Sequence, residues 1–353
     1  ILSVIPIIKK YDNDKSIGKI LITSSTLSSS KILEKIKFKK TIHQFYPIDH
    51  AIFSRKFLDH WKPNIAIFLE SEIWPSMFKS IKNRNILLIL LNARITKKSF
   101  DRWSKFKEFS YSIFGLIDKA YSQNSETNHY LKRLNVKNIQ SIGNMKFIED
   151  DNIKSDKSDK KLFSQFKKYK TFIAASTHET EELFAAKTHI LLKKKNKNII
   201  TIIIPRHINR VKQIIAEINE LGLNVVSRSS KKLKLKGIDI FIVDTFGETK
   251  KFYKFATTVF LGKSIIKGGG QNPLEPARFG AKILHGPDVN NFKDVYKYLR
   301  KLKISSVVNS PQKCADSIIF KKNMKKVQKM KYLGSTILKK TLNELDKSIH
   351  NEI

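Results

Sequence analysis

Apolar segments of strand length alternate with helical segments along nearly the whole chain, and this alternation runs through twice. Four of the segments are almost entirely apolar, at 65–69 and 86–91 in the first half and at 171–175 and 199–204 in the second. Strands that are apolar on both faces are typical of parallel sheets covered by helices. The pattern therefore predicts an α/β fold with parallel sheets.

A polar stretch at 149–161 has no apolar periodicity and separates the two halves. At roughly 150 residues per domain, 353 residues also favour two domains. The sequence predicts two Rossmann-like domains, at 1–150 and 165–353, with a linker at 151–164. Ligands of such domains bind at the carboxyl ends of the strands, so two facing domains predict a cleft. Further strands are expected at 19–23, 119–122, 138–142, 224–226, 238–243, 258–261 and 282–284, and helices from 30 and at 179–193, 209–221 and 315–353.

The composition limits the classes of protein to which the chain can belong. Hydrophobic residues make up 41% of it, enough for real cores, which excludes wholesale disorder. The single cysteine, Cys314, cannot form an internal disulfide and indicates a reducing compartment. No run approaches the about 18 consecutive apolar residues of a membrane span.

The charge is strongly basic, with 68 Lys+Arg against 31 Asp+Glu and a net charge of +37. Such a charge suits nucleic acid, an anionic membrane surface or phosphorylated substrates. The lysines are scattered over nearly every helix and turn, so solvated faces shaped by base composition are an equally good interpretation. There is no arginine-rich arm, zinc-finger spacing or RNP-like motif, so a nucleic acid partner is not expected.

The most informative segment is 268–277, with the sequence GGGQNPLEPA. Three glycines permit positive φ and a close approach to a ligand. Asn272 suits an N-cap and Pro273 the first helical position, so a helix is expected to start here with free N–H groups facing an anion. Glu275, one turn in, is a candidate acceptor for a ribose diol. Its alternative role is to complete a capping box with Asn272.

Other candidates follow the strands of the second half. Strand 199–204 ends in Pro205 and Arg206, and an arginine fork at this edge can grip phosphate, although a surface arginine is an equally good interpretation. Strand 238–243 is followed by the segment 244–248, DTFGE. After strand 171–175, Ser176 and Glu179 match a capping box that starts the next helix.

The first half offers charged side chains at corresponding places. Glu70 and Glu72 follow strand 65–69 and are candidates for an acid, a base or a charge stabiliser; the alternative is that they are acids at a helix N-terminus. Arg94 and Lys98 follow strand 86–91 and form part of a basic rim suited to acidic acceptors. Lys146, in the segment GNMKF, is expected to reach the cleft.

Asp12 and Asp14 have the D-x-D spacing of some divalent metal sites but are expected in a solvated turn rather than at a strand end. The sequence contains no HExxH, CxxC pair or Walker loop, which excludes the common zinc enzymes and P-loop NTPases.

Together these motifs resemble one family, the 3-deoxy-D-manno-octulosonic acid (Kdo) transferases of lipopolysaccharide assembly. The resemblance covers about residues 1–295 and rests on seven ordered motifs: ESEIWP (70–75), NAR (92–94), GNMKF (143–147), STHE (176–179), PRH (205–207), DTFGE (244–248) and GGQNPLE (269–275).

The resemblance implies a B-type glycosyltransferase fold and inverting transfer of Kdo from CMP-Kdo to a lipid A precursor, without metal or cofactor. It implies that Glu70 and Lys146 stabilise the transition state. It also implies work at the cytoplasmic face of the bacterial inner membrane, with an anionic inner-leaflet surface as a partner. The implied CMP-binding residues are Pro205, Arg206, Phe246, Gly247, Glu248, Asn272, Pro273, Leu274 and Glu275.

Two departures from the family pattern lead to expectations. Gln271 stands where family members commonly have His, so one contact of the glycine loop is expected to differ. By this resemblance the family's general base, a Glu in a Gly-Glu pair, falls directly before Ile1, and a membrane anchor falls further upstream. Residues 1–353 alone are therefore expected to fold and bind CMP but to transfer Kdo slowly or not at all. Another B-type nucleotide-sugar transferase or epimerase, or a basic nucleic-acid-binding protein, remains the alternative.

Overall fold

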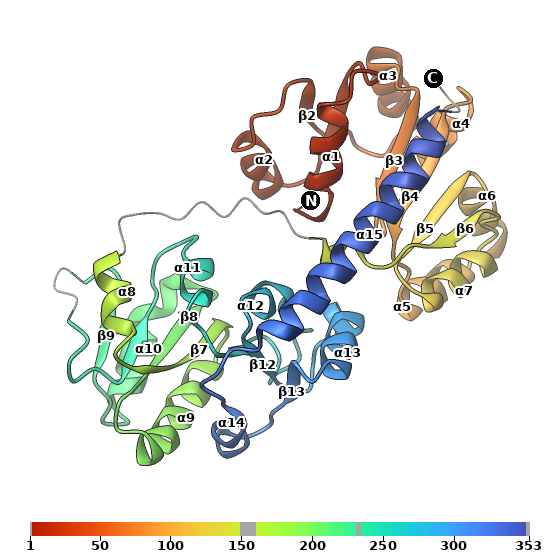
Figure 1. Ribbon diagram of the computed structural model, residues 1–353. Coiled ribbons are helices and arrows are strands. Elements are labelled where there is room, and N and C mark those ends of the chain that lie inside the picture. Colours follow the sequence, from red (N-terminus) through yellow and green to blue (C-terminus); the bar gives the residue numbers. More distant parts are fainter. Residues whose placement is uncertain (1, 149–159, 231–233, 351–353) are drawn as a thin grey trace. The chain divides into compact units, whose positions relative to one another are not determined.

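The computed structural model describes residues 2–148, 160–230 and 234–350 (Figure 1). The chain forms two compact units. Unit 1 comprises Ile1–Asn152 together with Lys331–Ile353, and unit 2 comprises Ile153–Met330. No helix in the described part of the chain is long and apolar enough to cross a membrane.

Unit 1 contains a four-stranded parallel sheet and a separate parallel strand pair. The order of the larger sheet is β3 (Ile65–Leu69), β4 (Leu87–Ala93), β5 (Lys119–Ser122) and β6 (Ile139–Ser141), and the pair is β1 (Ile20–Ser24) and β2 (Thr41–Phe45). The helices are α1 (Ile5–Asp12), α2 (Leu27–Glu34), α3 (Ala51–Trp61), α4 (Pro75–Lys82), α5 (Lys97–Ser104), α6 (Lys107–Phe114) and α7 (Ser125–Arg133), with 3-10 helices η1 (Leu2–Val4) and η2 (Met145–Phe147).

The two strands predicted to be buried on both faces in unit 1 differ in burial. From Leu88 to its end, β4 is buried, as expected for a strand with a neighbour on each side. In the four-stranded sheet β3 is an edge strand, and its Ile67 is 41% exposed. The prediction is therefore wrong for 65–69, because an apolar run does not reveal whether a second strand flanks it.

Unit 2 is built on a seven-stranded parallel sheet with the order β13-β12-β11-β7-β8-β10-β9. The strands are β7 (Lys170–Thr177), β8 (Ile199–Pro205), β9 (Val225–Ser227), β10 (Ile240–Ile242), β11 (Thr258–Leu261), β12 (Lys282–His285) and β13 (Ser305–Val307). The helices are α8 (Lys160–Phe166), α9 (Glu181–Lys195), α10 (Val211–Asn219), α11 (Thr249–Tyr253), α12 (Leu274–Arg278), α13 (Lys293–Lys301) and α14 (Pro311–Ser317), with 3-10 helices η4 (Ile208–Arg210) and η5 (Asn290–Phe292).

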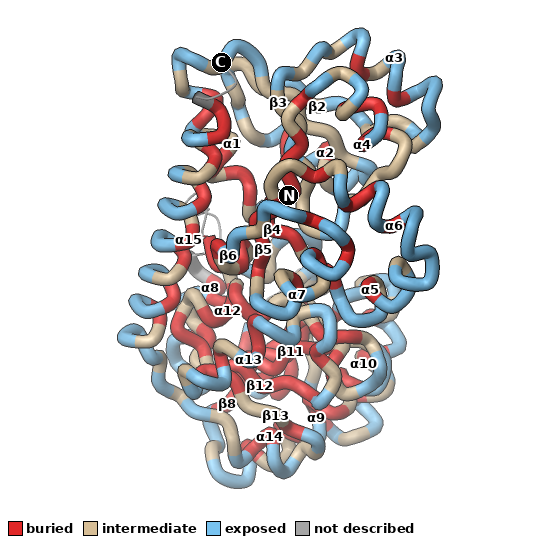
Figure 2. Tube along the Cα trace, turned by 90° about the vertical axis from the view of Figure 1, so that its right-hand side faces the viewer, coloured by how far each residue is buried: buried red, intermediate tan, exposed pale blue. Residues whose placement is uncertain are grey.

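The core of unit 2 lies along the middle of this sheet. All seven residues of β8 are buried, as the apolar run predicted, and Figure 2 shows buried residues concentrated in the strands. Phe184 of α9 stacks on Phe260 of β11 with ring centroids 5.1 Å apart. The strands therefore form a rigid frame whose carboxyl ends meet at one edge.

The last helix, α15 (Met324–His350), differs from the predicted domain boundary, which assigned all of 165–353 to the second domain. From Lys331 onward the helix belongs to unit 1. Its buried side chains recur at Ile337, Thr341 and Leu345, and Figure 2 shows one buried and one exposed side along the helix. The cause is packing: an apolar stripe at helical spacing must be covered, and unit 1 covers it.

The contacts that fix α15 to unit 1 come from three places in its first 148 residues. Lys10 Nζ lies 2.6 Å from Asp346 Oδ2, and Lys119 Nζ donates to Ser348 Oγ at 3.0 Å. A side chain at Gly334 would clash with the carbonyl of Phe147, because its Cβ would lie 2.4 Å from that oxygen. The glycine allows the helix to approach the backbone closely.

Three further predictions of local structure are wrong. Residues 151–159 of the predicted linker lie outside the described residues, but its last part is helical, because α8 begins at Lys160. The predicted capping box of Ser176 and Glu179 is absent: Ser176 still belongs to β7, and α9 begins only at Glu181 after Thr180 in a left-handed conformation. Strands β2 and β13 were not predicted.

Asp12 is not in a solvated turn. It is 5% exposed and accepts hydrogen bonds from the backbone N–H groups of Lys39 and Lys40, at 2.7 and 3.0 Å, and from the Thr41 hydroxyl at 2.6 Å. Burial alone would raise the pKa of this carboxyl, but these hydrogen bonds outweigh it and hold the pKa below its usual value. Asp12 therefore anchors the start of β2.

Candidate active site

Glu70 lies directly after β3, at the carboxyl edge of the unit 1 sheet. Its φ is +57°, its N–H donates to the carbonyl of Leu91 at 3.0 Å, and its own carbonyl accepts the N–H of Arg94 at 3.1 Å. These bonds hold the predicted residues Glu70 and Arg94 on neighbouring strand ends. Lys98, the other predicted rim residue, is exposed in the first turn of α5.

Lys146 approaches Glu70 from η2. Its Nζ lies 3.5 Å from Glu70 Oε1, and the two side chains are 23% and 34% exposed. Asn144 Oδ1 accepts the backbone N–H of Lys146 at 2.9 Å and caps the turn. The structure thus brings the two residues predicted to stabilise the transition state together as an ion pair within unit 1.

Asn92 connects the end of β4 to the turn that carries Lys146. It is 1% exposed with a φ of +52°, and its Oδ1 accepts the backbone N–H of Met145 at 3.0 Å. The amide of Gln123 donates to the backbone carbonyl of Asn92 at 2.9 Å. This positioning role could not be inferred from the NAR motif, because it depends on a residue 53 positions later.

In unit 2 the predicted nucleotide residues lie at or after the ends of β8, β10 and β11, three of four consecutive strands in the sheet. The order β11-β7-β8-β10 places the loops after β8, β10 and β11 at one edge. Pro205 is the buried last residue of β8, and the exposed Arg206 donates its backbone N–H to the carbonyl of Thr177 at 2.9 Å. The carboxyl ends of β7 and β8 are therefore tied together where Arg206 begins.

The segment after β10 contains an exposed aromatic ring and a carboxylate that is hydrogen-bonded to neighbouring side chains. Phe246 is 80% exposed, and Gly247 has a φ of +79°. Glu248 accepts from Arg228 Nε at 3.1 Å, from Lys251 Nζ at 3.0 Å and from the hydroxyl of Thr245. Burial would raise the pKa of Glu248, but these bonds outweigh it and hold the pKa below its usual value.

The N–H groups of the three glycines are all hydrogen-bonded within unit 2. Gly268 and Gly269 donate to Asp288 Oδ2, at 2.8 and 3.0 Å, and Gly270 donates to the carbonyl of Lys263 at 2.7 Å. These glycine N–H groups are therefore bonded within the protein, whereas the N–H groups predicted to face an anion are those of the helix that follows. The glycines are needed for the backbone itself, since Gly269 and Gly270 have φ values of +81° and +72°.

The helix predicted to begin at Pro273 begins one residue later in the structure. Helix α12 begins at Leu274 and has only five residues, with Pro273 at the N-cap; Asn272 Oδ1 accepts the N–H of Leu274 at 3.1 Å. The backbone carbonyl of Gln271 accepts the hydroxyl of Tyr296 at 3.0 Å. This contact does not depend on which side chain stands at position 271.

Two cations at this edge were missed by sequence reasoning. Lys250 Nζ lies 3.7 Å from Glu275 Oε1 and connects the segment after β10 to α12. Arg228, which holds Glu248, directly follows β9, so the rule that strand carboxyl ends carry the ligand would have found it. Lys250 stands in a short helix and gave no such signal.

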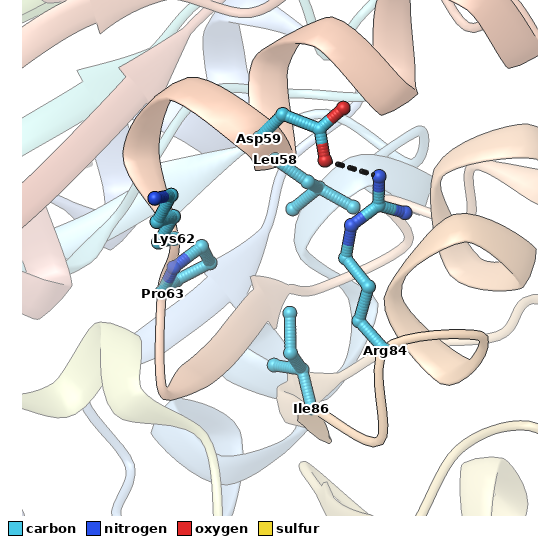
Figure 3. Close-up of a pocket in the computed structure, with 6 residues that line it drawn as sticks. All are labelled: Leu58, Asp59, Lys62, Pro63, Arg84 and Ile86. Atoms are coloured by element: carbon cyan, nitrogen blue, oxygen red, sulfur yellow. Dashed lines mark hydrogen bonds and ion pairs between the residues drawn. The ribbon is translucent and has the colours of Figure 1, made fainter.

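A pocket in unit 1 lies apart from all predicted site residues (Figure 3). Its lining comes from the end of α3 and the loops that precede β3 and β4, and includes an ion pair between Arg84 Nη2 and Asp59 Oδ1 at 2.5 Å. These loops lie at the amino ends of the strands, whereas ligands of α/β sheets bind at the carboxyl ends. The lining residues are Leu58, Asp59, Lys62, Pro63, Arg84 and Ile86.

Among the residues that the structure describes, no three or more His, Cys, Asp or Glu side chains are grouped so that they could hold a metal ion.

The residues of unit 1 match a known family. The protein-family model described as 3-deoxy-D-manno-octulosonic-acid transferase (kdotransferase) matches residues 1–149, which include Glu70, Asn92 and Lys146. A 3-deoxy-D-manno-octulosonic acid transferase of Rickettsia bellii is 34% identical over 293 residues, which are 83% of this chain and 69% of that protein. The chain belongs to the Kdo transferase family. The corresponding protein of Rickettsia felis is 38% identical over 279 residues, which are 79% of this chain. The chain spans about 60% of the length of that Kdo transferase.

The fold predicted from the family resemblance is confirmed. A solved UDP-GlcNAc 2-epimerase from Neisseria meningitidis, bound to UDP-GlcNAc, has a similar structure with a TM-score of 0.60 over 95% of this chain and 90% of that chain. Sequence identity is 13%, so the similarity shows the fold alone. This member of the Kdo transferase family therefore has the two Rossmann-like units of the B-type fold.

Proposed function

We propose that this protein is an inverting glycosyltransferase that moves Kdo from CMP-Kdo to a lipid A precursor. Family membership supports a Kdo transferase, and the resemblance of its motifs supports this donor and acceptor. The observation that carries the proposal is the Glu70–Lys146 ion pair at a strand carboxyl edge, formed by residues 76 positions apart in the sequence. A partly exposed ion pair stabilises a fold by only about 0–1 kcal/mol. Its position at the carboxyl edge of the sheet therefore favours a catalytic role over a stabilising one.

In the proposed reaction an acceptor hydroxyl attacks the anomeric carbon of Kdo. The new C–O bond forms as the bond from that carbon to the phosphate oxygen breaks, and CMP leaves with the bonding electrons. The hydroxyl proton passes to a base, and neither Glu70 nor Lys146 is assigned that role. The Glu70 carboxylate faces the positive charge that develops on the sugar, and Lys146 orients this carboxylate.

We assign CMP to unit 2. The guanidinium of Arg206 grips the phosphate, and the carboxylate of Glu275 accepts from the ribose hydroxyls. Lys250, 3.7 Å from Glu275, adds positive charge near the phosphate. Phe246, 80% exposed, offers an apolar surface for the base, and Pro205, Gly247, Glu248 and the segment 272–274 complete the site.

The acceptor is assigned to unit 1, where Arg94 and Lys98 provide positive charge for its phosphates. We propose that the protein works at the cytoplasmic face of the bacterial inner membrane, on an anionic lipid surface. The net charge of +37 supports this placement, because each lysine near such a surface adds about 1 kcal/mol of attraction.

Arg206→Ala and Glu275→Ala are each expected to weaken CMP binding about 10- to 100-fold without changing the fold. A hydrogen bond to a charged group contributes about 1.5–3 kcal/mol, which corresponds to this range. Isothermal titration calorimetry with CMP measures the effect, and Lys212→Ala, an exposed basic residue of α10, is the matched control.

Three outcomes of titrations with CMP, UDP and DNA would contradict the proposal. Unchanged CMP affinity in both variants would end the assignment of the nucleotide site. Tighter binding of UDP than of CMP by the unaltered protein would favour another B-type transferase or an epimerase, and binding of DNA alone would favour a nucleic-acid-binding protein.

A further inference from the structure

Helix α9 begins with two adjacent buried carboxylates that the proposed reaction does not use. Glu181 is 0% exposed and Glu182 is 1% exposed, whereas Glu179, two residues earlier, is exposed. Carboxylates are almost never fully buried unless they are paired, because the loss of water costs several kcal/mol. Their partners therefore indicate what the two residues do.

Glu181 accepts four backbone hydrogen bonds. Its Oε2 accepts the N–H of Lys263 at 2.7 Å and of His178 at 3.0 Å, and its Oε1 accepts those of Ser264 and Ile265 at 2.9 and 3.1 Å. Three of the four donors are consecutive residues that follow β11. One carboxylate thus fixes the whole first turn of the loop that leads to the glycines.

The loop that Glu181 holds is in turn hydrogen-bonded to the glycine segment. The carbonyl of Lys263 accepts the N–H of Gly270 at 2.7 Å, and the carbonyl of Ser264 accepts the N–H of Asp288 at 3.0 Å. Asp288 in turn accepts the N–H groups of Gly268 and Gly269. These bonds connect Glu181 to the glycines at 268–270, which directly precede Gln271 and the segment 272–275 with the proposed ribose contact.

Glu182 points to the other loop of the proposed site. Its Oε1 lies 3.5 Å from Arg210 Nη1, and the backbone N–H of Arg210 donates to the carbonyl of His207 at 3.2 Å. Arg210 ends η4, the turn that begins two residues after Arg206. The second carboxylate therefore holds the turn that follows the proposed phosphate ligand.

We propose that Glu181 and Glu182 are positioning residues that hold the two halves of the nucleotide site separately. Glu181 sets the loop that presents Asn272 and Glu275, and Glu182 sets the turn that presents Arg206. The inference rests on the proposed function, because it takes these residues as nucleotide ligands.

Double-mutant cycles on CMP affinity test this division of roles. Glu181→Gln is expected to weaken CMP binding about tenfold. In that background Glu275→Ala should cost less than threefold, while Arg206→Ala keeps its full cost. Glu182→Gln should give the reverse pattern, in which Arg206→Ala loses most of its effect and Glu275→Ala keeps it. A purely structural role would lower the stability of both variants without this selective coupling.

Glu179→Gln is the matched control, since the exposed Glu179 should change CMP affinity less than twofold and couple to neither ligand residue. All titrations are made under conditions in which urea unfolding curves show that more than nine-tenths of each variant is folded. If Glu181→Gln does not fold, Glu181→Asp keeps the charge but shortens the reach, and the Glu182→Gln cycle stands independently.

Additive effects in all four cycles would overturn the inference while leaving the nucleotide site in place. Failure of the unaltered protein to bind CMP, or normal affinity in both Arg206→Ala and Glu275→Ala, would overturn the proposed site and the inference with it. The single-variant titrations therefore distinguish the two failures.

Discussion

Glu70→Gln is expected to lower the rate of Kdo transfer about 10²–10³-fold, the loss typical of removing one charge stabiliser from an active site. The change is isosteric and removes only the negative charge, which in the proposed reaction faces the developing cation. The side chain is 34% exposed and its ion pair with Lys146 is 3.5 Å long, so the fold should be unaffected. CMP affinity, which depends on unit 2, should stay within about twofold.

Lys146→Met is expected to lower the rate by a similar factor, and the double variant should be little worse than either single one, because the two side chains act together. The matched control is Glu72→Gln. Glu72 is an exposed carboxylate two residues away that accepts the indole N–H of Trp74 at 2.8 Å. Rates are measured as release of CMP at saturating donor, in the complete protein that contains residues 1–353. Equal losses in Glu70→Gln and Glu72→Gln would remove the special role given to the Glu70–Lys146 pair.

A chain that ends at Met330 is expected to lose the fold of unit 1 and to keep that of unit 2. The truncation removes the buried side chains of Ile337, Leu345 and Ile349 from unit 1. Burial of a large aliphatic side chain contributes about 1.5–3 kcal/mol, so the loss of three is about 5–9 kcal/mol, enough to unfold a marginally stable domain. The ion pair of Lys10 is lost as well.

Hydrogen exchange measures the outcome unit by unit. Amides of β4 and β5 should exchange rapidly in the truncated chain, while those of β8 keep their protection. A chain that ends at His350 retains all of α15 and serves as the control. Unchanged protection in β4 after truncation at Met330 would show that unit 1 is stable without α15.

The alternation of strands and helices was predictable because it is a local property. Apolar runs such as β8 predicted buried parallel strands, and the rule that ligands meet strand carboxyl ends placed Glu70, Arg206 and Glu248 at the edges where the structure has them. The short strands β2 and β13 carry mixed side chains, and no local signal separates them from loops.

Contacts between distant parts of the chain could not be predicted from the sequence. The glycine N–H groups bind Asp288, twenty residues after Gly268, and Asp12 binds the backbone at 39–40. The sequence does not reveal which backbone N–H groups a given carboxylate will bind in the folded protein. The helix at 315–353 was likewise predicted, but not which unit would cover its buried side chains.

The most direct test of the central claim is the transfer reaction itself. The complete protein that contains residues 1–353 is incubated with CMP-Kdo and detergent-solubilised lipid A precursor, and the products are analysed by mass spectrometry. The account predicts lipid that has gained Kdo, one CMP released for each Kdo transferred, and loss of both products in Glu70→Gln. Unchanged CMP-Kdo and lipid in this assay, together with consumption of a UDP-sugar in a parallel incubation, would contradict it.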